Sequence, residues 1–99
     1  EIISVAQEKK VDLGDNTVEL CEKYLDGFPT HGMSSFANDL RNGRQMELEG
    51  LTGSVVRMGA EIGVATPIHR TFYGLLKPVA KRIEDSLGQD SQGGITVRI

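Results

Sequence analysis

The sequence lacks most of the features that mark a specialised class of protein. Its 99 residues include one cysteine and no tryptophan, so an internal disulfide is excluded. The 11 basic and 14 acidic side chains are mixed along the chain, and no basic block is available to bind nucleic acid. Apolar runs are only a few residues long, which predicts no membrane span and no secretory leader.

Metal chemistry also lacks a sequence signal. The two histidines, His31 and His69, lie far apart and have no cysteine nearby, so no metal-site spacing is present. We interpret His31 as a solvated loop residue and His69 as an exposed residue in the first turn of a helix. The composition predicts one soluble domain with a single core, and the unpaired Cys21 favours the reducing cytoplasm. Because the chain begins at Glu1 and enters an apolar run at once, we interpret it as a piece of a longer protein.

Helical periodicity and turn residues predict an all-α fold, a compact bundle of about six helices. The first two helices carry apolar faces that begin at Ile2 and Val18, and the second is expected to be capped by Asp15 or Asn16. Its stripe should be buried and consists of Val18, Cys21, Leu25 and Phe28. A short third helix should start at Ser34 or Ser35 and end at Asn42-Gly43.

A longer fourth helix is expected from about Arg44 to Ile62, where Gly63 stops it. Its predicted buried seam follows spacings of three and four and consists of Leu48, Leu51, Val55, Met58 and Ile62. Thr66-Pro67 should start the next helix, which Pro78 must kink or restart before it ends near Gly88. The polar tail from Gln89 to Gly94 is expected to be mobile, and Ile95 to Ile99 is interpreted as coil.

Glycines inside the fourth helix are unusual, because each costs roughly 1 kcal/mol relative to alanine. Gly53 and Gly59 favour close approach of a neighbouring helix. Gly50 lies on the same helical face as Glu47, where it either permits packing or clears a wall for a ligand. Glu47 itself has two interpretations, since an acid in a first helical turn also favours the helix dipole.

The two serines carry a similar ambiguity. Most N-terminal serines only cap a helix, yet a hydroxyl beside open N–H groups also suits a carboxylate or phosphate. Ser35 and Glu47 are twelve residues apart, about 18 Å in one unbroken helix. We expect the break at Asn42-Gly43 to fold the third helix back, so that both residues approach one cleft.

Several fixed offsets together resemble one known family. The residues are Ser34-Ser35-Phe36, Asp39-Leu40, Gly43-Arg44, Glu47-Leu48, Gly53, Gly63-Val64 and Thr66-Pro67. They are similar to the C-terminal domain of the ketopantoate reductases (2-dehydropantoate 2-reductases), over about residues 34 to 67. The resemblance implies the helical domain of a two-domain, 6-phosphogluconate-dehydrogenase-like reductase, with residues 1 to 99 as the C-terminal substrate domain. Its partner would be the chain's own N-terminal Rossmann domain.

The resemblance also implies the chemistry. Family members reduce ketopantoate to pantoate, on the way to pantothenate and coenzyme A, with NADPH bound mainly by the N-terminal domain. Ser35 would contact the substrate carboxylate, with Ser34 and Asn38 beside it, while the N–H groups of Ala37 and Asn38 stay open. Glu47 would support catalysis and reach the nicotinamide-ribose side of the cofactor. The general-acid lysine lies before this segment, so the 99-residue chain alone is predicted to be inactive.

Departures from the family pattern keep alternatives open. Phe36 replaces a methionine, Met46 a threonine, and Thr52 the asparagine before Gly53. The last two could alter substrate contacts, so a relative that reduces another 2-keto acid remains an alternative. A helical interaction or dimerisation module without chemistry is the other, and a homodimer is compatible with each reading.

Overall fold

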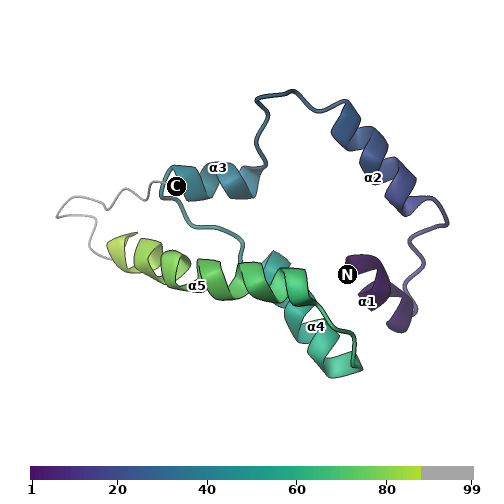
Figure 1. The fold of residues 1–99 in the computed structure, drawn as a ribbon. Helices are drawn as coiled ribbons and strands as arrows, with labels where there is room; N and C mark the ends of the chain where they lie inside the picture. The colour runs from purple at the N-terminus through teal and green to yellow at the C-terminus, as the bar shows by residue number, and fades with distance from the viewer. Residues whose placement is uncertain (88–99) are drawn as a thin grey trace.

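The computed structural model describes residues 1–87, which form five α-helices and one short π-helix (Figure 1). No strand occurs among these residues, so the predicted all-α class is confirmed. The calls for a mobile tail at 89–94 and for coil at 95–99 lie outside the described residues. In chain order the elements are α1 Ile2–Glu8, α2 Thr17–Asp26, α3 Ser35–Arg41, η1 Glu49–Gly53, α4 Ser54–Ile62 and α5 Pro67–Leu87.

Four of these elements pack together and are called the packed unit: α1, η1, α4 and α5. α4 and α5 form a hairpin, and α1 lies against α4 (Figure 1). Within residues 1–87, four apolar side chains are buried. Val5 and Ala6 lie on α1, Leu48 directly precedes η1, and Ile83 lies on α5. Leu48 and Ile83 are 2% and 1% exposed, and full burial of one such side chain contributes about 1.5–3 kcal/mol.

The fourth helix begins later than the sequence predicts. Residues 44–47 are not helical, Glu49–Gly53 form the π-helix, and regular α-helix starts only at Ser54. The predicted seam is therefore wrong at Leu51, which is 55% exposed, whereas Leu48 is buried. A π-turn closes hydrogen bonds over five residues, so it shifts the helical register that the seam assumed. Gly63 ends α4 in the left-handed conformation at φ 75°, as predicted.

The last helix is continuous. α5 runs through Pro78 without restarting. The two helices that could have flanked Pro78 are therefore one, which lowers the number of helices below the predicted six. Proline normally clashes with the carbonyl four residues earlier. Here that residue is the exposed Gly74, with nothing within 4 Å of where its Cβ would stand, so its carbonyl has room to tilt towards water.

Glu1 provides an N-terminal cap for α5 from the other end of the sequence. Its carboxylate accepts from the N–H groups of Ile68 at 2.7 Å and His69 at 2.9 Å, and it contacts His69 Nδ1 at 2.6 Å. Desolvation of Glu1 opposes its ionisation, but the two N–H groups and the His69 ring outweigh this and lower its pKa to about 2. His69 is thus in the first turn of α5 as expected, but it is half-buried rather than exposed.

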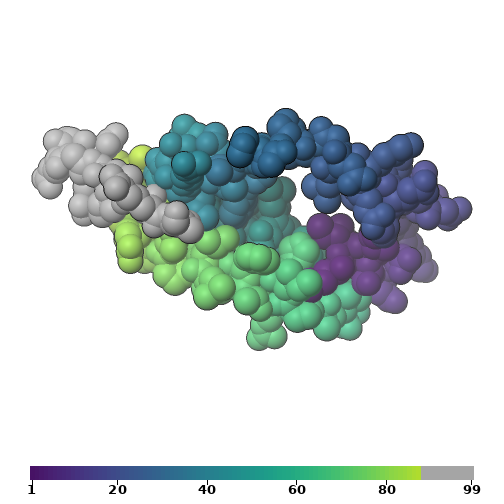
Figure 2. All heavy atoms as spheres, turned by 45° about the horizontal axis from the view of Figure 1, so that its top comes forward, coloured from purple at the N-terminus to yellow at the C-terminus, as the bar shows by residue number. Residues whose placement is uncertain are grey.

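The second region, called the arm, consists of α2 and α3 and has no buried residue. The expected burial of the α2 stripe is wrong: Val18, Leu25 and Phe28 are exposed, and so is Cys21. Asn16 stands at the N-cap position of α2 but makes no side-chain capping bond, while the Thr17 hydroxyl bonds the Leu13 carbonyl at 2.8 Å. Figure 2 shows residues of the arm running along one edge of the molecule beyond α1.

Candidate functional site

The stretch 39–53 places the motif residues in three successive local structures. At the end of α3, Arg44 donates its backbone N–H to the Asp39 carbonyl at 2.8 Å and its Nε to the Asp39 carboxylate at 3.1 Å. Gly43 has a φ of 66°, which favours glycine. The motif residues Asp39, Gly43 and Arg44 therefore close α3 and direct the chain into the extended segment 44–47.

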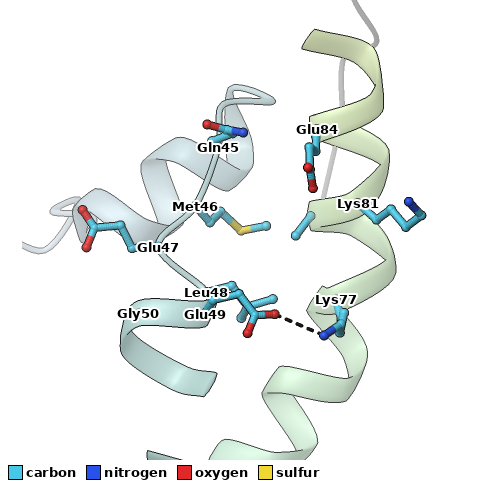
Figure 3. A pocket seen from close by; sticks show the side chains of 10 residues that line it. Gln45, Met46, Glu47, Leu48, Glu49, Gly50, Lys77, Lys81 and Glu84 are labelled. Carbon is cyan, nitrogen blue, oxygen red and sulfur yellow. Dashed lines mark hydrogen bonds and ion pairs between the residues drawn. The ribbon is translucent and has the colours of Figure 1, made fainter. Parts of the chain in front are cut away.

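This segment and α5 form the two walls of an open groove of about 580 Å³. The groove lies where the chain approaches the second half of α5 (Figure 3). It is lined by Gln45, Met46, Glu47, Leu48, Glu49, Gly50, Lys77, Ala80, Lys81 and Glu84. Two residues singled out from the sequence, Glu47 and Gly50, are thus brought to the same wall.

Two neighbouring side chains of the segment 44–47, which has no regular secondary structure, point to opposite sides (Figure 3). In Figure 3 Met46 points towards α5, whereas the Glu47 carboxylate points to the opposite side. Glu47 is exposed and has no side-chain hydrogen bond within residues 1–87. It lies two residues before the π-helix, so its interpretation as an acid in a first helical turn is wrong, and Glu49 takes that position. The carboxylate of Glu47 is therefore presented to the surroundings of the groove rather than to α5.

Glu49 is the centre of a four-residue network, called the Glu49 cluster, with Arg57, Tyr73 and Lys77. Its carboxylate accepts from the Tyr73 hydroxyl at 2.8 and 2.9 Å, from Arg57 Nη1 at 2.9 Å and from Lys77 Nζ at 3.2 Å. Lys77 Nζ also donates to the Tyr73 hydroxyl at 2.7 Å and stands 4.9 Å from the centre of that ring. The cluster joins η1 and α4 to α5 at the edge of the groove.

The donors in this cluster fix its charges. The hydroxyl of Tyr73, then Arg57 and Lys77, lower the pKa of Glu49 to about 2. Hydrogen bonds to Tyr73 and then to Glu49 raise the pKa of Lys77. Near neutral pH the cluster therefore holds an ionised carboxylate and an ionised ammonium group, and Lys77 is committed to that carboxylate.

The three glycines of the predicted fourth helix differ in how closely other atoms approach them. A Cβ at Gly53 would stand 2.9 Å from both Arg57 Nη1 and Tyr73 Cε2, and a Cβ at Gly59 would stand 2.7 Å from the Val64 carbonyl oxygen. The predicted close approach of a neighbouring helix is confirmed at Gly53, because Tyr73 belongs to α5, whereas the close atoms at Gly59 belong to Val64 and Thr66 of the loop between α4 and α5. At Gly50 nothing lies within 4 Å, so packing does not require this glycine. Gly50 lines the groove with open space beside it, as the alternative interpretation, a wall cleared for a ligand, requires.

The serines stand at the start of α3. Ser34 is the N-cap, and its Oγ accepts from the N–H of Ala37 at 3.1 Å; Ser35 is the first helical residue and is exposed. The expectation that the N–H groups of Ala37 and Asn38 stay open is wrong, because Asn38 donates to the Ser34 carbonyl at 2.9 Å. What Ser35 offers a ligand is its hydroxyl.

Ser34, Ser35 and Asn38 do not line the groove that carries Glu47. The break at Asn42-Gly43 is present, but a shared cleft for Ser35 and Glu47 stays a prediction. Within residues 1–87 no group of three acidic, histidine or cysteine side chains could hold a metal ion. None of the helices in that range is long and apolar enough to cross a membrane. His31 is exposed in the loop before α3, as expected.

Sequence reasoning missed the Glu49 cluster. Its members are separated by up to 28 positions, from Glu49 to Lys77, and no local period connects them. The one available signal was the spacing of Tyr73 and Lys77, which places both on one face of a helix. That spacing indicates a pair but cannot identify Glu49 as its partner.

Comparison with known proteins gives two matches. The family model described as "Ketopantoate reductase PanE/ApbA C terminal" matches residues 1–80. A curated protein from Pyrobaculum aerophilum, named 2-dehydropantoate 2-reductase, is 30% identical over 77 residues, which cover 78% of this chain. The matched region spans 27% of the length of that relative. No solved structure matches the chain.

Proposed function

Because the chain belongs to the ketopantoate reductase C-terminal family, we propose that it is the helical substrate domain of an NADPH-dependent 2-dehydropantoate 2-reductase. The complete protein would reduce ketopantoate to pantoate, for pantothenate and coenzyme A synthesis in the cytoplasm. An N-terminal Rossmann domain would bind most of the cofactor and close against this domain. The observation that carries the proposal is the match of residues 1–80 to this family; the exposed carboxylate of Glu47, which points away from α5 and stays available to a neighbouring domain, supports it (Figure 3).

The chemistry of Glu47 fits a hydroxyl-bearing ligand. An ionised carboxylate only accepts hydrogen bonds, and a ribose or a substrate hydroxyl is a suitable donor. Residues 1–87 are entirely α- or π-helical or irregular and contain no strand followed by a glycine-rich dinucleotide loop. NADPH would supply the hydride, and this chain would contribute a contact from Glu47 and no nucleotide cradle. The general-acid lysine would come from the part that precedes this domain.

Ser35 would bind the other end of the substrate. Its exposed hydroxyl can donate one hydrogen bond to a carboxylate, while the neighbouring Ser34 hydroxyl is used to cap α3. In the full-length protein Ser35→Ala should raise the Michaelis constant for ketopantoate by a factor equivalent to about 1.5–3 kcal/mol. The matched control is Ser34→Ala, which should mainly lower the melting temperature through loss of the cap. An unchanged Michaelis constant for Ser35→Ala would remove Ser35 from the site.

The departures at Met46 and Thr52 leave the keto acid to be measured. Met46 points towards α5, on the side opposite the Glu47 carboxylate, so its replacement of threonine leaves the Glu47 side unchanged (Figure 3). The experiment is NADPH oxidation by the full-length protein with ketopantoate and with its analogue lacking the hydroxymethyl group. A preference for the analogue would assign the domain to a different keto acid, and no oxidation with either would favour a non-catalytic helical module.

A further inference from the structure

The Glu49 cluster holds the π-helix from two sides. Arg57 Nη2 donates to the backbone carbonyl of Glu49 at 2.6 Å, and the Ser54 hydroxyl donates to the carbonyl of Gly50 at 2.8 Å. The Glu49 carboxylate is meanwhile bound by Tyr73 and Lys77 of α5. The backbone of Glu49 is thus bound by α4, and its side chain by both α4 and α5.

The charged members of this cluster are exposed: the side chains of Glu49, Arg57 and Lys77 are 56%, 53% and 59% exposed, and Tyr73 is half-buried. Isolated exposed ion pairs contribute little to stability. Here one carboxylate is shared by three donors, and the Tyr73 ring lies directly over Gly53, where a Cβ would stand 2.9 Å from Cε2. The absence of a side chain at Gly53 is what allows the ring, the guanidinium and the carboxylate to meet.

The π-helix in turn sets the backbone of Glu47. The N–H of Leu51 donates to the Glu47 carbonyl at 3.0 Å, and the N–H of Gly53 donates to the Leu48 carbonyl at 2.7 Å. Single π-turns are uncommon and are frequent at functional sites. A change that relaxes this turn towards regular α-helix would rotate Glu47 and Leu48 relative to α5.

We propose that Glu49 and Tyr73 are positioning residues, which hold the π-turn so that Glu47 faces the reacting molecules. This inference rests on the proposed function. Neither residue needs to touch the substrate or the cofactor, because the Glu49 carboxylate is fully engaged within the domain. Tyr73→Phe is the sharpest test, since it removes the hydroxyl and keeps the ring that packs over Gly53.

The first measurement does not depend on activity. Amide hydrogen exchange of Leu51 and Gly53 is followed in the full-length protein and in its Tyr73→Phe and Glu49→Gln variants. We call the hydrogen bonds by which the Glu49 cluster holds the π-turn the clamp. Loss of one of these hydrogen bonds should speed exchange at these amides about three- to tenfold. The matched control is Tyr24→Phe on α2, which changes the other tyrosine of the chain and should leave both amides unchanged.

The second measurement asks whether the clamp acts through Glu47. Tyr73→Phe should lower kcat/KM for ketopantoate roughly three- to tenfold when Glu47 is present, and less than about twofold in a Glu47→Gln background. A purely structural role would give the same factor in both backgrounds. Tyr24→Phe should have no effect in either.

The outcomes separate the two proposals. Unchanged exchange at Leu51 and Gly53 in Tyr73→Phe overturns the clamp, whatever the activity. Equal loss of kcat/KM in both backgrounds overturns its action through Glu47. A wild-type protein that reduces no 2-keto acid overturns the proposed function and the catalytic part of this inference, while the exchange measurement still decides whether the clamp exists.

Discussion

Helices of the packed unit and of the arm have similar apolar faces, but among residues 1–87 only the faces in the packed unit are covered by neighbouring elements. α4, α5 and the arm helix α2 each have an apolar face at helical spacing, yet the buried residues belong to the packed unit. Leu48 at its centre is 2% exposed, whereas Tyr24 and Leu25 on α2 are 69% and 66% exposed. A hydrophobic stripe therefore predicts a buried face only when the partner surface is present.

The two regions also differ in how they position the candidate functional residues Glu47 and Ser35. The backbone carbonyl of Glu47 accepts from the N–H of Leu51, so the backbone of Glu47 is fixed within the packed unit. Ser35 stands on α3, which has no buried residue. Placement of Glu47 is thus determined within the described residues, while placement of Ser35 depends on what α3 packs against.

The largest expected difference between the regions is the cost of removing a leucine side chain. Leu48→Ala should destabilise the chain by about 2–5 kcal/mol, because a fully buried site loses its contacts and leaves a cavity. Leu25→Ala on α2 should change stability by less than about 0.5 kcal/mol in the 99-residue chain. Urea unfolding of both variants measures this. Equal losses would show that α2 is packed after all.

A second comparison lies within the packed unit, between two glycines of η1. Gly53→Ala should destabilise by about 1–3 kcal/mol, because its Cβ meets the Glu49 cluster. Gly50→Ala meets nothing and should stabilise by roughly 0.5–1 kcal/mol through higher helix propensity. Thermal unfolding of the two variants checks the sign. A stabilising Gly53→Ala would contradict the packing described around Tyr73.

The smallest effect is a pH dependence that belongs to the packed unit. Glu1 and Glu49 have pKa values of about 2, below the ordinary 4.5, so their stabilisation is complete above pH 4.5 and is lost as the pH falls towards 2. Urea midpoints measured across this window should fall. The fall of the urea midpoint should be shallower in two variants. Glu1→Gln removes a carboxylate with a lowered pKa, and Tyr73→Phe removes the main hydrogen-bond donor to Glu49. Parallel curves for all three proteins would contradict these assignments.

Local signals predicted much of this fold. A cap at Ser34 or Ser35, a stop at Gly63 and a start at Thr66-Pro67 each depend on a few neighbouring residues, and all three mark the observed ends of helices. The family motif, which combines several such signals, identified the family that residues 1–80 match.

What the sequence did not predict depends on contacts between distant residues. The π-turn is held by Tyr73 and Lys77, and α5 is capped by Glu1 from 67 positions away, so neither is visible in a local pattern. The register shift at η1 also left Leu51 exposed, while Leu48 is buried as predicted. Glu47 and Gly50 both line the groove, while their role as a site stays a prediction, and the contacts of Glu49 beside them were missed.

The role of Glu47 is tested most directly by one substitution in the full-length protein. Glu47→Gln keeps the size of the side chain but loses its charge and one acceptor, and its matched control is Glu61→Gln on the exposed face of α4. The account predicts that kcat/KM for NADPH-dependent reduction of ketopantoate falls at least about tenfold, or about 1.4 kcal/mol, in Glu47→Gln alone. Full activity of Glu47→Gln, with or without a small change in stability, would contradict it.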